Sequence, residues 1–276
     1  MKAPIVEIFS SFQGEGLLIG RRQIFIRFAG CNLNCIYCDT QISRNSNDFD
    51  FFSVDELIEK INNLITPDLH SISITGGEPT LYIDFINNLI EKIDYPVLLE
   101  TNGSLPEEIA KFKKNNNNDL VSLDIKLPEF INNQKIYKCE IESIKILLNN
   151  NINVYSKVVV SPNTNLITFE SIIKELFDEI KNIPISRFNL IIQPQSPMEL
   201  WKNDINELDY FENLSDLSDL HDLNNVNNLD KRSNLNNNID KGNNANKNKF
   251  FQFCEIAGKY FSVFLIPQVH KFLDIE

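Results

Sequence analysis

The chain has 276 residues, of which 42% are hydrophobic, and its 26 basic and 38 acidic side chains give a formal net charge of -12. This composition supports a large apolar core, which excludes a wholly disordered chain. The acidic balance argues against binding nucleic acid through its phosphates, and no run of about 18 apolar residues offers a membrane span. Because the first residues lack the apolar region of a signal peptide, we expect a cytoplasmic protein.

Apolar runs alternate with amphipathic segments along the chain. Strands are predicted at residues 23–28, 71–75, 97–100, 120–125, 154–160, 188–193 and 262–266. Helices are predicted at 57–64, after a capping box that begins at Ser53, and at 82–93, 106–114, 141–148, 169–180 and 250–260. This alternation is typical of βα units and predicts an α/β fold with a parallel sheet, curled or open. Ligands bind such sheets beyond the carboxyl ends of the strands, where the polar motifs described below fall.

Residues 198–249 break the pattern. The segment is rich in Asn, Asp and Leu and contains near-repeats such as the one at residues 216–220, DLSDL. We predict a single domain over residues 1–276, with a low-complexity, mostly disordered insertion at 198–249. A small interaction helix is the alternative, although pairs of Asn residues oppose it.

Three of the five cysteines, Cys31, Cys35 and Cys38, form a C-x3-C-x2-C arrangement, whereas Cys139 and Cys254 are isolated and are expected to be packed thiols. Three thiolates this close can hold three corners of a cubic iron–sulfur cluster and leave the fourth iron open. One alternative is a structural zinc site, although such a site prefers four ligands. The other alternative is that the three cysteines are thiols without a bound metal. An open iron takes a ligand from a substrate or cofactor, which indicates a catalytic centre.

The cysteine spacing, with Tyr37 before the last cysteine, resembles the signature of the radical S-adenosylmethionine (SAM) superfamily. The resemblance implies an incomplete (βα) barrel of the radical SAM type. It also implies a 4Fe-4S cluster whose open iron binds the methionine moiety of SAM. One-electron reduction of the sulfonium would then release a 5′-deoxyadenosyl radical.

Motifs at later strand ends resemble those with which the superfamily holds SAM. Residues 75–79 read TGGEP, residues 100–103 read ETNG and residues 122–126 read SLDIK. Taken alone, each has a structural alternative: a Gly-Gly turn, an Asn-Gly turn or a polar strand end. The resemblance implies cofactor contacts from Tyr37, Cys38, Asp39, Gly76, Gly77, Glu78, Glu100, Ser122, Leu123, Asp124 and Gln193.

Side chains around the cysteines indicate the substrate chemistry. Gln13 and Glu15 offer an amide and a carboxylate to a flat ring rich in donors and acceptors, although Glu15 could also be solvated. Arg27 can form a bidentate pair with a ligand carboxylate or serve as a surface cation. Thr40 offers a hydroxyl to Mg²⁺, or it caps a helix. His270 is expected to be a satisfied histidine and is given no catalytic role.

Within the superfamily, five segments resemble the family of 7-carboxy-7-deazaguanine synthases: FQGEG, RFAGCNLNCIYCDT, TGGEPTL, ETNG and the late PQVHK. The resemblance implies ring contraction of 6-carboxy-5,6,7,8-tetrahydropterin with loss of ammonia, on the way to queuosine or archaeosine. It implies Mg²⁺ at Thr40, a flavodoxin- or ferredoxin-like electron donor and a homodimer. It implies substrate contacts from Phe12, Gln13, Gly14, Glu15, Arg27 and Thr75.

Three other functions share some of these features. An activase that makes a glycyl radical on a partner protein needs the cysteine motif and the GGEP-like turn, but not Gln13, Arg27 or Thr40. An electron carrier or a zinc module needs four protein ligands, and three are present in the motif. The intact cysteines argue against a degenerate binding protein that kept the fold.

Overall fold

The structure, a computed structural model, describes residues 1–38, 40–45, 48–131, 135–201 and 248–273. Within these residues nine strands form one sheet in the order β3-β1-β2-β4-β5-β6-β7-β8-β9. Strands β2 and β4 to β9 are parallel, whereas β1 pairs antiparallel with β2 and β3. The strands are β1 (Lys2–Phe12), β2 (Arg22–Phe28), β3 (Asp50–Ser53), β4 (Ser71–Gly76), β5 (Val97–Thr101), β6 (Leu120–Ile125), β7 (Asn153–Val160), β8 (Phe188–Pro194) and β9 (Val263–Leu265).

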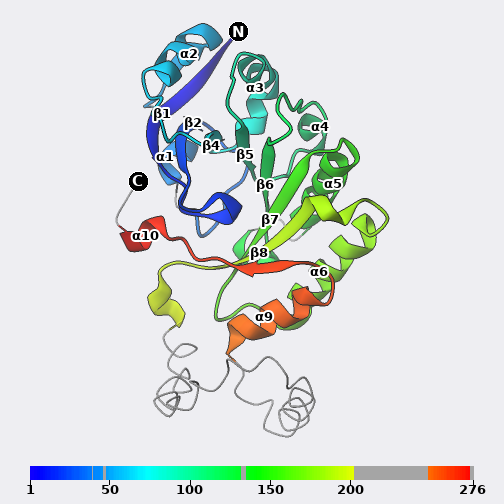
Figure 1. Ribbon diagram of the computed structural model, residues 1–276. Coiled ribbons are helices and arrows are strands. Elements are labelled where there is room, and N and C mark those ends of the chain that lie inside the picture. The colour runs from blue at the N-terminus through cyan, green and yellow to red at the C-terminus, as the bar shows by residue number, and fades with distance from the viewer. Residues whose placement is uncertain (39, 46–47, 132–134, 202–247, 274–276) are drawn as a thin grey trace, which may run out of the picture.

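Helices connect the parallel strands and cover one side of the curved sheet (Figure 1). The α-helices are α1 (Gln41–Asn45), α2 (Val54–Asn62), α3 (Ile83–Ile90), α4 (Pro106–Ile109), α5 (Ile136–Asn149), α6 (Leu166–Ile180), α9 (Lys249–Gly258) and α10 (His270–Leu273). The 3-10 helices are η1 (Gly16–Leu18), η2 (Pro79–Tyr82), η3 (Pro128–Phe130), η4 (Ile185–Arg187) and η5 (Met198–Trp201). The end strands β3 and β9 do not pair with each other, so the sheet of the described residues is open. The predicted α/β fold with an incomplete barrel is confirmed.

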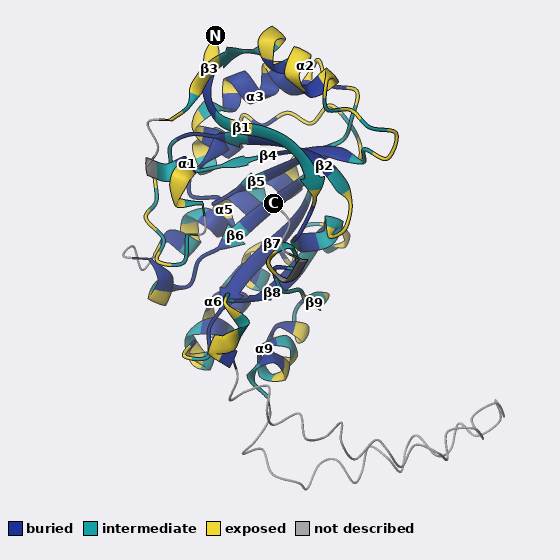
Figure 2. Ribbon diagram, turned by 90° about the vertical axis from the view of Figure 1, so that its left-hand side faces the viewer, coloured by how far each residue is buried: buried dark blue, intermediate teal, exposed yellow. Residues whose placement is uncertain are grey.

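The parallel strands form where the sequence has short apolar runs without helical spacing. Ile24 and Ile26 of β2 and Ile72 and Ile74 of β4 are fully buried, and dark blue strands run through the centre of Figure 2. Helix α2 begins at the predicted capping box, in which the Ser53 hydroxyl accepts from the Glu56 amide and the Glu56 carboxylate accepts from the Ser53 amide. Strand pairing and helix docking therefore bring the strand ends together at one edge.

The structure differs from the sequence prediction at the first sheet edge. Strand β1 was not predicted, because Pro4 and Glu7 interrupt its apolar run, and neither was its short partner β3. β1 is stabilised as a strand by pairing rather than by its local sequence pattern, because it forms hydrogen-bonded ladders with the strands on both sides. Helix α4 ends at Ile109, short of the predicted residue 114, and α5 begins at Ile136, five residues before its predicted start.

Both ends of the predicted insertion lie in the described part of the chain. Trp201 of η5 is fully buried, packs at a tilt against the Phe250 ring of α9 with ring centroids 4.4 Å apart, and donates from its indole nitrogen to the Gln195 carbonyl. The remainder of the predicted insertion, residues 202–247, lies outside the described residues, so its disorder stays a prediction. Among the helices that the structure describes, none has the length and apolarity needed to cross a membrane.

Candidate active site

A cavity of about 460 Å³ opens at the carboxyl ends of β4 to β8, where it also receives residues from β1, β2 and the C-terminal segment. Of the residues predicted from the sequence as site residues, the cavity is lined by Phe12, Gln13, Gly14, Glu15, Arg27, Cys31, Cys35, Tyr37, Cys38, Thr40, Thr75, Gly76, Gly77, Glu100, Asp124 and Gln193. Asp39 lies outside the described residues. The fold therefore collects in one place segments that are far apart in the sequence.

Three predicted cofactor residues do not line the cavity: Glu78, Ser122 and Leu123. Leu123 points into the hydrophobic core because alternate residues of a strand face opposite sides. Ser122 shares a face with Asp124 but lies two residues deeper in β6 and is buried. Glu78 is buried beneath the turn that follows β4, where it accepts hydrogen bonds from Thr80, Thr101 and Asn102. Glu78 therefore links the end of β4 to the end of β5 through hydrogen bonds.

The loop between β2 and α1 carries the three clustered cysteines, all half-buried. Its Ile36 amide donates to the Phe130 carbonyl, and Tyr37 packs edge-on against the Phe130 ring with centroids 4.9 Å apart. Burial raises the pKa of the Cys31 and Cys35 thiols, so a positive centre is needed to hold them as thiolates.

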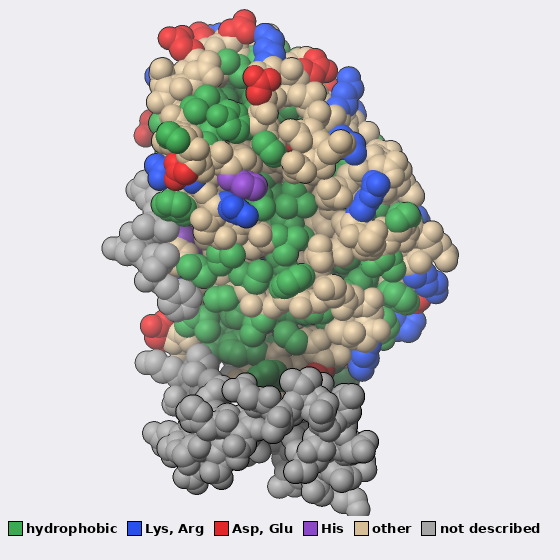
Figure 3. Space-filling model, in the orientation of Figure 1, with side chains coloured by type: hydrophobic (Ala, Val, Ile, Leu, Met, Phe, Trp, Pro, Cys, Tyr) green, Lys and Arg blue, Asp and Glu red, His purple; other side chains and the backbone are tan. Residues whose placement is uncertain are grey.

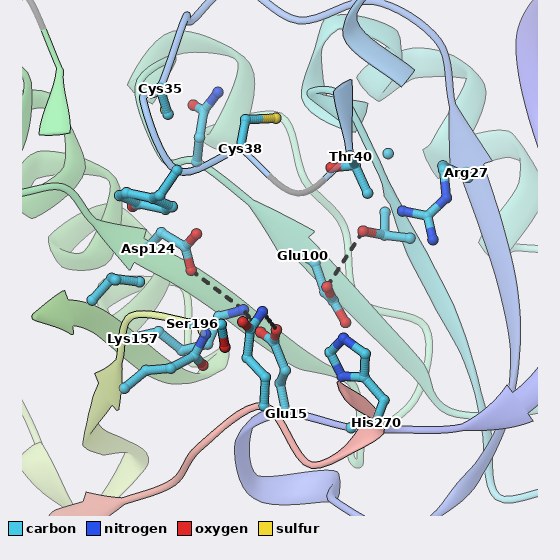
Figure 4. A pocket seen from close by; sticks show the side chains of 18 of the residues that line it. Glu15, Arg27, Cys35, Cys38, Thr40, Glu100, Asp124, Lys157, Ser196 and His270 are labelled. Carbon is cyan, nitrogen blue, oxygen red and sulfur yellow. Dashed lines mark hydrogen bonds and ion pairs between the residues drawn. The ribbon is translucent and has the colours of Figure 1, made fainter. Parts of the chain in front are cut away.

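Among the described residues, no three His, Cys, Asp or Glu side chains form a ready site for a single metal ion. A cubic cluster does not need such convergence, because each thiolate binds a different iron corner. Figure 4 shows Cys35 and Cys38 on one side of the cavity, above Asp124. The three cysteines lie at the cavity wall, where each could bind a different iron of a cluster.

The glycines after β4 bring backbone close to the cysteine loop. Gly76 has a φ of +133°, which disfavours any side chain. A Cβ at Gly77 would overlap the Gly30 carbonyl oxygen. The Gly77 amide donates to Phe28 and the Glu78 amide to Gly30. These contacts hold the end of β4 against the residue that precedes Cys31, so the two motifs form one wall of the cavity.

An ammonium lies between two carboxylates on the opposite side of the cavity (Figure 4). Lys157 Nζ of β7 is 2.7 Å from Glu15 Oε2 and 3.5 Å from Asp124 Oδ1. Burial alone would raise the pKa of Glu15, but Lys157, with smaller effects from Gln268 and His270, outweighs burial and lowers it to about 2. On its other side Asp124 is 3.1 Å from Lys126 Nζ, which also faces the Tyr37 ring. Lys157 therefore helps to hold Glu15 ionised and also pairs with Asp124.

Glu100 at the end of β5 collects hydroxyl and amide donors. It accepts from Gln13 Nε2 at 2.8 Å, from Ser73 Oγ at 3.2 Å and from Thr75 Oγ1 at 3.3 Å. Gln13 also donates to Gln23 and is buried. Glu100 therefore orients two of the predicted substrate residues, one on β4 and one directly after β1.

Arg27 of β2 enters the cavity beside Thr40, as Figure 4 shows. Its Nε donates to Glu7 Oε1 at 2.5 Å, and its guanidinium carbon lies 5.8 Å from the centre of the Phe9 ring. A guanidinium has five N–H donors, so the two terminal nitrogens can still form a bidentate pair with a ligand carboxylate.

Several cavity residues were not predicted from the sequence: Glu7, Lys126, Lys157, Gln195, Ser196, Gln268 and His270. The lysines carried a usable signal, because Lys is seldom buried in a strand unless it is paired. Gln193, which was predicted, is 4% exposed, and its Oε1 lacks a hydrogen-bond partner among the described residues. A buried orphan acceptor that lines a cavity indicates a ligand with a donor group.

Comparisons with known proteins find relatives over most or all of the chain. A family model described as the radical SAM superfamily matches residues 25–176. The chain is 40% identical to the 7-carboxy-7-deazaguanine synthase of Methanothermobacter thermautotrophicus, over 100% of this chain and 99% of the relative. It is also 40% identical to the enzyme of that name from Methanocaldococcus jannaschii, over 70% of this chain and 83% of the relative.

The fold has a counterpart among solved structures. The crystal structure of QueE from Escherichia coli superposes with a TM-score of 0.54, covering 75% of this chain and 92% of that one. The two sequences are 22% identical over that superposition. This likeness supports the open α/β architecture described above.

Proposed function

The chain belongs to the radical SAM superfamily and, within it, to the family of 7-carboxy-7-deazaguanine synthases, and from this premise we propose its reaction in detail. It is an enzyme of the carbon–nitrogen lyase type. The proposed reaction converts 6-carboxy-5,6,7,8-tetrahydropterin into 7-carboxy-7-deazaguanine by ring contraction with loss of ammonia. The observation that carries the proposal is the meeting of the cysteine loop, Arg27 and Gln13 in one cavity.

Membership of the superfamily implies a 4Fe-4S cluster and SAM. Cys31, Cys35 and Cys38 would hold the cluster, which with SAM supplies the one-electron chemistry that starts the reaction. Three features of the cavity fit SAM: the glycine-lined end of β4, the Asp124 carboxylate and the orphan Gln193 oxygen. Carboxylates bind ribose hydroxyls, and bare backbone accepts an amino group. Tyr37, Asp39 and Glu100 complete the proposed cofactor set.

The substrate would occupy the side of the cavity formed by β1 and β2. Arg27 would bind its carboxylate, and Gln13 and Glu15 would bind the donor and acceptor edge of its ring. The Phe12 ring, Gly14 and the Thr75 hydroxyl complete the proposed set. The support for this arrangement is that all six residues line one cavity and that Glu100 fixes both Gln13 and Thr75.

Mg²⁺ at Thr40 is part of the proposal. Magnesium takes few protein ligands and fills its shell with water and substrate oxygens, so one hydroxyl beside Arg27 suffices. We expect Thr40→Val to raise the Mg²⁺ concentration needed for half-maximal turnover at least about tenfold, because even residues that only hydrogen-bond to metal ligands are worth about 10- to 100-fold. Titration of turnover with Mg²⁺ measures this, and an unchanged requirement would exclude Thr40 as a ligand.

The setting of the reaction is also proposed. The product would enter queuosine or archaeosine synthesis, and the enzyme would act in the cytoplasm on a small molecule rather than on nucleic acid. A flavodoxin- or ferredoxin-like protein would supply electrons. A homodimer is supported by exposed Phe264 and Leu265 on end strand β9 and by the hydrophobic side chains across the middle of the face in Figure 3.

Anaerobic reconstitution tests the reaction. The protein is loaded with iron and sulfide, then given reductant, SAM, Mg²⁺ and the carboxytetrahydropterin. We expect the deazapurine and ammonia in equal amounts, measured by mass spectrometry and an ammonia assay. A fully loaded protein that cleaves SAM but leaves the pterin unchanged would refute the substrate and favour an activase of a glycyl radical protein.

A further inference from the structure

Lys157 is a buried cation in the middle of an apolar strand. It lies on β7, where the other residues from Val154 to Val160 are also buried, and its side chain is 9% exposed. An ammonium at such a position is retained only when it is paired, because desolvation of an unpaired charge is costly. Its partners are two carboxylates that line the cavity, those of Glu15 and Asp124. Lys157 is not part of the cysteine motif, so binding of the cluster does not explain why it is there.

The contacts of Lys157 reach across the molecule. Its Nζ is 2.7 Å from Glu15, which precedes it by 142 residues, and 3.5 Å from Asp124 on the next strand. Gln268, from the C-terminal segment, donates to the second oxygen of Glu15. Glu15 itself follows β1 and has no rigid element of its own. Lys157 and Gln268 therefore fix the direction of a loop carboxylate.

We propose that Lys157 is a positioning residue that holds Glu15 as a fixed, ionised acceptor for the donor edge of the substrate ring. This inference rests on the proposed function, in which a pterin occupies the cavity. A pterin ring presents a ring N–H and an exocyclic amino group side by side. Each carboxylate oxygen has two lone-pair sites. Lys157 and Gln268 take one site on each oxygen, so each oxygen keeps one site for the paired donors of the ring.

The charges around Glu15 explain why a cation is needed there. Glu100 from β5 and Asp124 from β6 face the same cavity with like charge, and His270 faces it from the C-terminal segment. Burial raises the pKa of Glu15, and Lys157 is the largest of the groups that together bring it down to about 2; Gln268 and His270 are the others. Without the ammonium, burial still raises the pKa of Glu15, and only the Gln268 hydrogen bond and His270 oppose it, so the carboxyl shifts toward its protonated form. A protonated carboxyl has lost part of its acceptor capacity and cannot serve two donors.

Binding of 6-carboxypterin, a fluorescent analogue of the substrate that is not turned over, tests the inference between pH 5.5 and 7.5. For the wild-type protein, Glu15 should contribute no pH dependence across this range, because its pKa lies far below it. We expect Lys157→Met to bind about 10- to 100-fold more weakly at pH 5.5, the usual worth of a hydrogen bond to a charged group. The deficit relative to wild type should shrink as the pH rises and Glu15 ionises.

Two further variants separate positioning from folding. Lys157→Arg keeps the charge and should restore most of the binding and remove the pH-dependent deficit relative to wild type. In a Glu15→Gln background, Lys157→Met should weaken pterin binding little beyond the loss caused by Glu15→Gln alone. The effects of two substitutions do not add when one residue acts through the other. Exposed Lys174, which pairs with Asp178 on α6, provides the matched control, and Lys174→Met should bind as the wild type does. Lys157→Gln replaces the Met variant if that chain does not fold.

The outcomes distinguish this inference from the proposed function. If the wild type binds 6-carboxypterin and Lys157→Met weakens binding by the same factor at every pH, Lys157 only supports the fold and the inference is wrong. An additive loss in the Glu15→Gln background leads to the same conclusion. If the wild type itself does not bind the pterin, the proposed substrate is wrong and the inference falls with it.

Discussion

Cys35→Ala is expected to abolish turnover and to lower the iron bound per chain. The variant removes one of three thiolates on the loop between β2 and α1, where the Cys35 side chain lines the cavity. Changes that touch only the surroundings of a metal ligand cost about 10- to 100-fold in affinity or activity. Loss of a ligand should therefore take product formation below detection. Iron and sulfide analysis, with the visible absorption of the reconstituted protein, measures cluster content directly.

The chain provides a matched control for this variant. Cys139 on α5 is also half-buried but does not line the cavity. Cys139→Ala should keep the cluster, the absorption spectrum and the rate of the wild type. If Cys35→Ala retained full iron content and turnover, the cluster would have to use other ligands, and the assignment of the cysteine loop would be overturned.

The alternation of strands and helices was predictable because parallel strands are buried on both faces and appear as short apolar runs. Strand β6 was predicted with its exact bounds, and Ser53 correctly marked the start of α2. Strand β1 was missed because, after its buried residues 3–5, the strand is only partly buried and Glu7 interrupts its pattern. Its identity as a strand comes from pairing with β2, which local sequence does not encode.

The position of the candidate site was predictable for a similar reason. The motifs follow successive parallel strands, and the carboxyl ends of such strands meet at one edge. The contacts between motifs were not predictable, because they depend on how the sheet curves. The bond between Gln268 and Glu15 spans 253 residues, and that between Lys157 and Glu15 spans 142. Such pairs cannot be predicted from the spacing of residues along the chain.

Glu78 illustrates a limit of assigning ligand contacts from motifs, because it does not line the cavity. In TGGEP it looks like one more polar group beside the glycines. In the structure it is fully buried, and it accepts from the hydroxyl of Thr101 and the amide of Asn102. Two neighbouring motifs are thus tied together by one carboxylate. A motif residue can serve the site by holding its backbone in place rather than by facing the ligand.

Arg27→Ala is expected to raise the KM for the pterin about 10- to 100-fold while leaving the cluster intact. The loss corresponds to one charge-assisted bidentate pair, about 1.5 to 3 kcal/mol. The expected damage to the fold is small, because the Glu7 partner of Arg27 is 44% exposed and can be solvated once the guanidinium is gone. Iron content and SAM binding should match the wild type. Steady-state kinetics with saturating SAM separates KM from kcat.

Arg27→Lys makes the test specific to geometry. Lysine keeps the positive charge but replaces the planar fork with a single ammonium, so it cannot make two parallel hydrogen bonds to a carboxylate. It also lacks the Nε that donates to Glu7, so the orientation of the side chain is lost as well. We therefore expect Arg27→Lys to recover only part of the affinity. Because ground-state binding is removed in both variants, kcat should change much less than KM. A variant whose kcat falls while its KM stays constant would show that Arg27 acts on the reacting ring rather than on the substrate carboxylate.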